Sequence, residues 1–120
     1  MTRHILLAED EAFLAILVTE ALEDAGHAVI GPCQTVAQAL AALAGAERCD
    51  AAVIDANLRG ASAAPVAEAL AARGIPFLVT TGYLRSQLPP VLAGAPVLSK
   101  PVRMAELTDA LDGLLPPASG

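Results

Sequence analysis

Hydrophobic residues along the chain fall into five short runs that alternate with longer amphipathic segments. The runs lie at residues 5–8, 28–30, 51–54, 77–80 and 97–98. The stronger runs are continuously apolar and do not alternate between apolar and polar positions. This pattern is typical of strands that are covered on both faces, as in a parallel sheet.

The segments between these runs predict helices with recognisable ends. Apolar residues recur at spacings of three and four, and the first helix is predicted to end at Gly26. Thr35 with Gln38 forms a capping-box pattern at the start of the second helix, and Pro65 suits the first turn of the third. The last helix is predicted to stop at residues 116–117, a Pro-Pro pair.

The fourth helix is the weak element of this pattern. Pro89 and Pro90 lack backbone N–H donors, and Pro89 disfavours helical geometry at Leu88. We therefore expect a short turn of helix or irregular chain between Tyr83 and Pro96. The alternation as a whole predicts a doubly wound α/β domain that spans residues 1–120.

Composition narrows the class of protein. The chain has 120 residues, of which 55% are hydrophobic and 17% charged, which suits one folded domain and not a disordered segment. No apolar run is long enough for a membrane span, and no signal-peptide pattern is present, so we expect a cytoplasmic protein. Cys33 and Cys49 are then expected to be free thiols. A net charge of −6, with seven Lys and Arg and no basic run, argues against nucleic-acid binding.

Polar residues with possible chemistry follow four of the five predicted strands. They are Glu9, Asp10 and Glu11 after the first, Asp55 after the third, Thr81 and Gly82 after the fourth, and Lys100 and Pro101 after the fifth. Each alone has an ordinary explanation, such as a helix start, a turn or a surface lysine. Together they would meet at the carboxyl edge of the sheet, where doubly wound sheets bind ligands.

The chemistry of this set points to phosphoryl transfer. Clustered carboxylates repel one another, and Mg²⁺, which prefers oxygen ligands, would relieve that repulsion. With Mg²⁺ and Lys100 beside it, Asp55 can stay ionised and attack phosphorus to form an aspartyl phosphate. Thr81 would donate a hydrogen bond to a phosphoryl oxygen.

Four short stretches also carry a family resemblance. Residues 5–11, 53–55, 79–82 and 100–101 resemble the four signatures of bacterial response-regulator receiver domains. The resemblance extends over essentially the whole chain. It implies a flavodoxin-like sheet of five parallel strands in the order 2-1-3-4-5. It also implies a signalling domain that catalyses only its own phosphorylation and dephosphorylation.

The resemblance assigns roles to the residues of the predicted metal site. Asp55 would be the phosphoacceptor, and Asp10 would bind the metal directly. Glu9 would act through water, and Asn57 would offer its backbone carbonyl.

It assigns further roles to the residues beyond the fourth and fifth strands. Thr81 and Lys100 would contact the phosphoryl group, while Gly82, Tyr83 and Pro101 would modulate the site. The bond between Lys100 and Pro101 is expected to be cis.

The sequence departs from the common receiver pattern in three places, which are Val97, the fourth helix broken by prolines, and Tyr83 after Thr81-Gly82. Val97 stands where most receivers have an aromatic residue that reports phosphorylation. Residues 55–60, 77–83 and 96–101 resemble an alphaproteobacterial subgroup of stand-alone receivers with a Phe-Ala-Thr-Gly-x-Tyr-type fourth strand. The expected partners are a sensor histidine kinase or histidine phosphotransfer protein and a downstream protein of unknown identity.

Two other functions remain open from the sequence. A receiver-like scaffold could keep the fold without being phosphorylated, although the complete set of acids, Thr81 and Lys100 argues against it. A phosphatase-like enzyme with an aspartyl nucleophile usually needs a second acid two residues further on. That position is Asn57 here.

Overall fold

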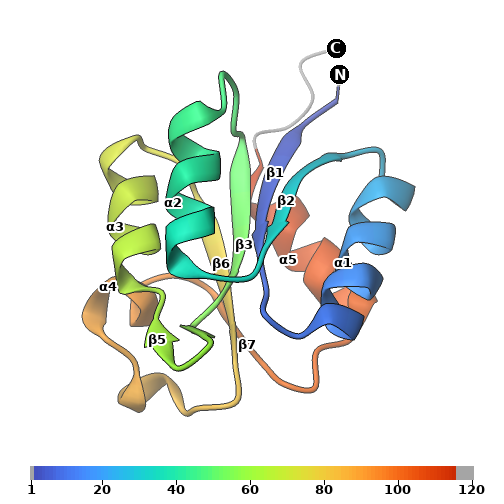
Figure 1. Ribbon diagram of the computed structural model, residues 1–120. Coiled ribbons are helices and arrows are strands. Elements are labelled where there is room, and N and C mark those ends of the chain that lie inside the picture. The colour runs from blue at the N-terminus through green and yellow to red at the C-terminus, as the bar shows by residue number, and fades with distance from the viewer. Residues whose placement is uncertain (1, 116–120) are drawn as a thin grey trace.

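A computed structural model describes residues 2–115 and contains one central five-stranded parallel sheet (Figure 1). The strands are β1 (His4–Ala8), β2 (Ala28–Cys33), β3 (Ala51–Asp55), β6 (Phe77–Thr81) and β7 (Val97–Ser99). Their spatial order is β2-β1-β3-β6-β7, so the predicted 2-1-3-4-5 order is confirmed. The fold is the flavodoxin-like doubly wound sheet.

Five α-helices lie on the two faces of this sheet. They are α1 (Ala12–Asp24), α2 (Val36–Gly45), α3 (Ala64–Ala72), α4 (Pro90–Ala93) and α5 (Met104–Leu114). Helices α1 and α5 pack on one face, and α2, α3 and α4 pack on the other (Figure 1). None of the helices within residues 2–115 is both long enough and apolar enough to cross a membrane.

Strand β1 explains why the strands are continuously apolar. Leu6 and Ala8 belong to the core beneath α2 and α3, whereas Ile5 and Leu7 belong to the core beneath α1 and α5. All four side chains are at most 1% exposed. Because both faces are covered by helices, successive positions of the strand must all be apolar.

The predicted helix ends are largely confirmed. Gly26 follows α1 with a φ of 91°, and Pro65 lies in the first turn of α3. Thr35 caps α2 by accepting a hydrogen bond from the N–H of Gln38, as the capping box predicts. The Gln38 side chain accepts from Gln34 instead of from Thr35, so the reciprocal bond is shifted by one residue. The predicted stop at residues 116–117 lies outside the described residues.

The expected weakness of the fourth helix is also confirmed. Between β6 and β7 the chain forms a 3₁₀ turn, η1 (Arg85–Gln87), and then the four-residue α4. Leu88 lies between them in an extended conformation, with φ −92° and ψ 148°, as expected of a residue before proline. Leu92 is fully buried and attaches this short helix to the core.

One element was not predicted. Directly after β3, strands β4 (Asn57–Leu58) and β5 (Ala61–Ser62) form a small antiparallel hairpin beside the carboxyl edge of the main sheet. Two-residue strands are too short to leave a periodic pattern in the sequence. This hairpin forms part of the candidate site.

Candidate functional site

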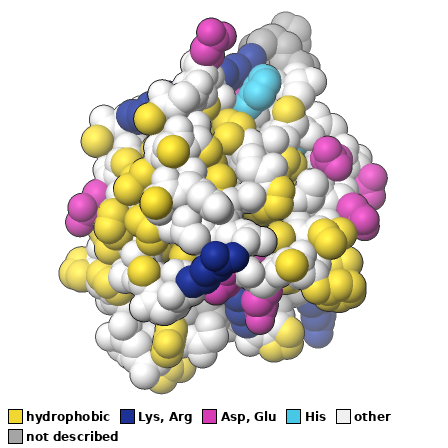
Figure 2. Space-filling view, in the orientation of Figure 1, with side chains coloured by type: hydrophobic (Ala, Val, Ile, Leu, Met, Phe, Trp, Pro, Cys, Tyr) yellow, Lys and Arg dark blue, Asp and Glu magenta, His cyan; other side chains and the backbone are white. Residues whose placement is uncertain are grey.

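The parallel strands bring the predicted acids together at one edge of the sheet. Glu9 follows β1 and is only 3% exposed, and its backbone N–H donates to the Cys33 carbonyl at 2.8 Å. Glu9, Asp10 and Asp55 each offer a carboxylate oxygen within 4.8 Å of the others. Acidic and basic side chains gather on the lower part of the face in Figure 2, where the carboxyl ends of the strands lie in Figure 1. The structure therefore contains the predicted acidic cluster.

Asp55 ends β3 and is held by hydrogen bonds at both carboxylate oxygens. Oδ1 accepts from the N–H of Asn57 at 3.2 Å, and Oδ2 accepts from Nζ of Lys100 at 2.7 Å. The residue is 6% exposed, so most of its surface is protected from water. A buried carboxylate next to an ammonium group has the charge balance that a nucleophilic acid needs.

Lys100 forms a bridge across the carboxylates. Besides Asp55, its Nζ lies 3.4 Å from Oε1 of Glu9 and 3.6 Å from Oε2 of Glu11. Its backbone N–H donates to the Thr81 carbonyl at 2.8 Å, which fixes the strand end from which the side chain extends. The bond between Lys100 and Pro101 is cis, as expected.

Burial and charge leave Glu9 in an unusual state. Burial, together with the charge of Asp55, raises the pKa of Glu9 to about 7, although the N–H of Glu11 and the charge of Lys100 oppose this shift. Near neutral pH a proton therefore neutralises Glu9 in part of the molecules, which removes one negative charge from the acidic cluster. A cation that bound here would release that proton.

The pKa values of Asp10 and Lys100 shift in the direction that keeps each group ionised. Burial raises the pKa of Asp10, but hydrogen bonds from the Arg59 N–H and with Glu9 outweigh it, and the net pKa lies below its usual range. Burial lowers the pKa of Lys100, but the hydrogen bond and charge of Asp55 outweigh it, and the net pKa is raised. Asp10 and Lys100 are thus charged throughout the neutral range.

Thr81 and Tyr83 lie on the other side of Asp55, at the end of β6. Thr81 is 1% exposed, and its Oγ1 accepts a hydrogen bond from the N–H of Tyr83 at 2.9 Å. Because Oγ1 is the acceptor in this bond, the hydroxyl hydrogen of Thr81 is available for another partner. The Tyr83 ring belongs to a residue that is 52% exposed. A Cβ added at Gly82 would meet nothing within 4 Å, so local crowding does not require glycine there.

Tyr83 and Asn57 line the same cavity, whose wall also includes Ala56, the residue that follows Asp55. Its volume is about 250 Å³, and its walls come from Ala56, Asn57, Ser62, Tyr83, Gln87, Leu88 and Pro89. The hairpin thus forms one wall, and the segment after β6 forms the other. Asp55 is not one of the lining residues, so the role of Tyr83 at the site stays a prediction.

Arg59 and Gln34 were missed by the sequence reasoning. The Arg59 N–H donates to Oδ2 of Asp10 at 2.9 Å, and the Arg59 guanidinium donates to the side-chain oxygen of Gln34. The only sequence signal was the Gly60 that follows Arg59, which marks a turn but not its target.

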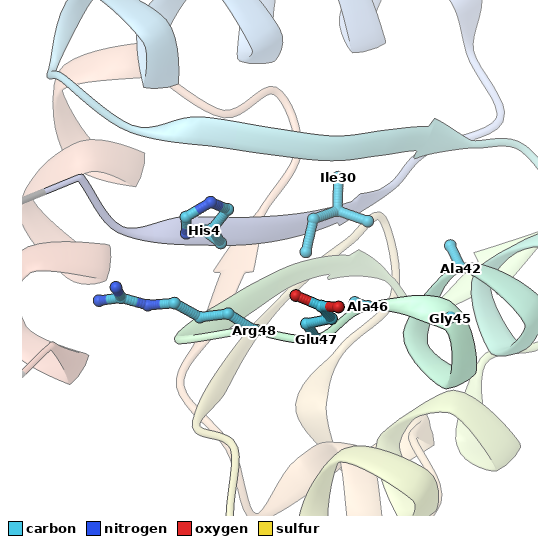
Figure 3. A pocket seen from close by; sticks show the side chains of 7 residues that line it. All are labelled: His4, Ile30, Ala42, Gly45, Ala46, Glu47 and Arg48. Atoms are coloured by element: carbon cyan, nitrogen blue, oxygen red, sulfur yellow. The ribbon is translucent and has the colours of Figure 1, made fainter.

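A larger cavity, of about 590 Å³, lies at the opposite end of the sheet and contains none of the predicted residues. It is lined by His4, Ile30, Ala42, Gly45, Ala46, Glu47 and Arg48 (Figure 3). The Nε of Arg48 on its rim is already bound by both carboxylate oxygens of Asp50, at 3.2 and 3.0 Å.

Cys33 and Cys49 are free thiols, as expected.

Comparison with solved structures places this arrangement among known proteins. The chain is 40% identical to SdrG from Sphingomonas melonis Fr1, with 94% of this chain and 96% of that chain covered and a TM-score of 0.80. The BeF₃-activated conformation of SdrG from Pseudomonas melonis Fr1 matches with 40% identity, a TM-score of 0.77 and coverage of 97% and 100%. A response regulator receiver protein from Sinorhizobium medicae WSM419 is 27% identical over 94% of both chains, with a TM-score of 0.80.

Two other comparisons gave no match. No protein-family model matched the chain, and a search of curated proteins found no similar sequence.

Proposed function

Since this chain belongs to the response-regulator receiver domains, we propose that it accepts a phosphoryl group on Asp55 from a phosphohistidine of a partner protein, in a Mg²⁺-dependent reaction. The partner would be a sensor histidine kinase or a histidine phosphotransfer protein. The observation that carries the proposal is the position of Asp55, which lies 2.7 Å from Lys100 and beside two further carboxylates.

The donor set fits Mg²⁺. Carboxylate oxygens are the hard ligands that this ion prefers, and three of them lie within 4.8 Å of one another. Asp10 and Asp55 would bind the ion directly, Glu9 would act through water, and Asn57 would add its backbone carbonyl. When bound, the ion would neutralise charge on the transferring phosphoryl oxygens.

The residues of the chain would carry out the transfer itself. An Asp55 carboxylate oxygen would form a bond to phosphorus as the bond from phosphorus to the histidine nitrogen breaks. The leaving imidazole would keep the electron pair and later take a proton from solvent. Lys100 and the free hydroxyl hydrogen of Thr81 would then stabilise the phosphoryl oxygens.

The signalling role is a further part of the proposal. The chain would act as a stand-alone receiver in the cytoplasm and would signal through contacts with a downstream protein or act as a phosphate sink. The BeF₃-activated conformation of the similar protein SdrG supports a phosphorylation-dependent role, since BeF₃⁻ resembles a phosphoryl group in shape and charge.

Intact mass spectrometry after incubation with acetyl phosphate tests the proposal. We expect one phosphoryl adduct in the presence of Mg²⁺, little adduct in a chelator and none for Asp55→Asn. Asp24→Asn, an exposed aspartate at the end of α1, is the matched control and should be phosphorylated normally. Absence of the adduct in the unmodified protein would contradict the proposal and favour a non-phosphorylated scaffold.

A further inference from the structure

The turn between β4 and β5 places an arginine in a backbone conformation that arginine rarely adopts. Arg59 has a φ of 51°, and Gly60 follows it with a φ of 83°. Two consecutive residues with positive φ are typical of a two-residue hairpin turn, in which Asn-Gly is the preferred pair. Arginine at the first position is strained, and strained residues persist where the surrounding contacts compensate for them.

The strained turn places a backbone N–H where it can donate to the acidic cluster. The backbone N–H of Arg59 donates to Oδ2 of Asp10 at 2.9 Å, across 49 positions of sequence. At the base of the hairpin, the N–H of Asn57 donates to Oδ1 of Asp55, and Oδ1 of Asn57 accepts from the N–H of Gly60. One hairpin therefore connects the two carboxylates that would bind the metal directly.

The side chain of Arg59 is held apart from the acids. Its guanidinium donates to the side-chain amide oxygen of Gln34. The backbone N–H of Gln34 in turn donates to the side-chain oxygen of Gln38, at the start of α2. Within residues 2–115, no ion pair joins Arg59 to a carboxylate. The guanidinium therefore contacts a neutral amide and none of the acids of the cluster.

We propose that Arg59 is a positioning residue for Asp10, an inference that rests on the proposed Mg²⁺ site. Its backbone N–H fixes one oxygen of Asp10 and so restricts how the carboxylate presents the other. Its tether to Gln34 keeps the guanidinium from competing with the metal for the carboxylates. Arg59 itself is not a ligand.

Variants that separate the turn from the side chain test the backbone role. Arg59→Gly keeps the left-handed turn and the N–H, so the Mg²⁺ affinity measured by calorimetry should stay within about twofold of the unmodified protein. Arg59→Val disfavours positive φ and should weaken Mg²⁺ binding by about fivefold or more.

Ala61→Val is the matched control, because Ala61 is an exposed residue of β5 in the same hairpin. It should bind Mg²⁺ as the unmodified protein does. Equal weakening in Ala61→Val and Arg59→Val, or no weakening in either, would overturn the backbone role.

A second measurement does not depend on how the valine variant folds. In the metal-free protein, Asp10→Asn removes the charge of the acceptor, so the NMR signal of the Arg59 amide proton should move upfield. The amide signal of Ala61 should move much less. An Arg59 amide signal that is indifferent to Asp10→Asn would contradict the proposed hydrogen bond.

If the contact with Gln34 restrains the guanidinium, the effects of changing Gln34 and Arg59 on Mg²⁺ binding should not add. Gln34→Ala should weaken Mg²⁺ binding by about threefold, because the released guanidinium pairs with the acids. In the Arg59→Gly background the same change should have no effect. An equal loss in both backgrounds would overturn the tether, whereas no Mg²⁺ binding by the unmodified protein would refute the metal site itself.

Discussion

The two sides of Asp55 differ in how firmly they are held. On the side of β1 and the β4–β5 hairpin, each acid accepts a hydrogen bond from the backbone: Glu9 from Glu11, Asp10 from Arg59 and Asp55 from Asn57. On the side that follows β6, Tyr83 and Leu84 are 52% and 70% exposed. The acids are thus preorganised by backbone hydrogen bonds, whereas the side chains that follow Thr81 are less constrained by packing.

The less constrained side is attached to the core through partly buried Leu88, Val91 and Ala95 and through fully buried Leu92 of α4. The guanidinium of Arg85 donates to the carbonyls of Ala93 and Ala95. These contacts hold η1 and α4 together without a regular helix. A small perturbation there should therefore loosen the segment without affecting the acids.

The largest predicted effect comes from removing the anchor of the less constrained side. Leu92→Ala should destabilise the fold by about 2–5 kcal/mol, because it leaves a cavity under α4. Hydrogen exchange should accelerate first in residues 83–96 and later at the hairpin. Leu84→Ala, the same change at an exposed leucine, should alter stability by less than about 0.5 kcal/mol. Uniform acceleration in both regions would remove the contrast between them.

The next effect concerns the raised pKa of Glu9 on the preorganised side. Glu9 has a pKa of about 7 in the folded protein and 4.5 as its ordinary value. The folded state thus binds an extra proton between these pH values, and the metal-free protein should lose stability as pH rises through that range. Glu9→Gln should abolish about 2 kcal/mol of this loss.

Urea unfolding in a chelator at pH 4.5 and pH 7 measures the effect. Glu23→Gln, an exposed glutamate of α1, is the control and should keep the slope of the unmodified protein. A slope that survives in Glu9→Gln would show that another group is responsible.

Mg²⁺ binding by Asp10 gives a somewhat smaller effect. Millimolar Mg²⁺ should raise the melting temperature of the unmodified protein beyond an ionic-strength control, because the ion binds only the folded state. Asp10→Asn should weaken Mg²⁺ binding by at least tenfold, or about 1.4 kcal/mol. Asp24→Asn should not. Unchanged affinity of Asp10→Asn in a calorimetric titration would remove Asp10 from the site.

The smallest predicted effect tests whether the exposed tyrosine protects the phosphoryl group. Tyr83 and Asn57 line one cavity together with Ala56, the residue that follows Asp55, and we expect an attacking water to approach Asp55 from there. Tyr83→Ala should speed loss of phosphate several-fold, which corresponds to about 1 kcal/mol in the barrier. Leu84→Ala is the neighbouring control. A half-life that is unchanged or longer in Tyr83→Ala would leave Tyr83 as a packing or partner-binding residue.

Much of the fold could be predicted because the parallel sheet imposes a strong pattern. Strands covered on both faces must be apolar at successive positions, and strand ends then place Asp55, Thr81 and Lys100 at one edge. The second strand was predicted too short. It continues to Cys33, which pairs with Ala8 across an irregularity in the register, and tertiary pairing of this kind overrides local signals.

The hairpin and its contacts could not be predicted for a related reason. Arg59 lies 49 residues from Asp10 and 25 from Gln34, and no local pattern specifies either contact. Its turn also lacks the usual Asn-Gly pair. The residues that carry charge were therefore predictable, but the residues that position them were not.

Chemical mapping of the phosphorylated residue tests whether Asp55 is the phosphoacceptor. Borohydride reduces an aspartyl phosphate to homoserine, so treatment of the protein after acetyl phosphate and Mg²⁺ marks the acceptor in a peptide digest. We expect homoserine at position 55 and at no other aspartate, and none in Asp55→Asn. Homoserine at Asp10, or no homoserine in a protein that carries the phosphoryl adduct, would contradict this expectation.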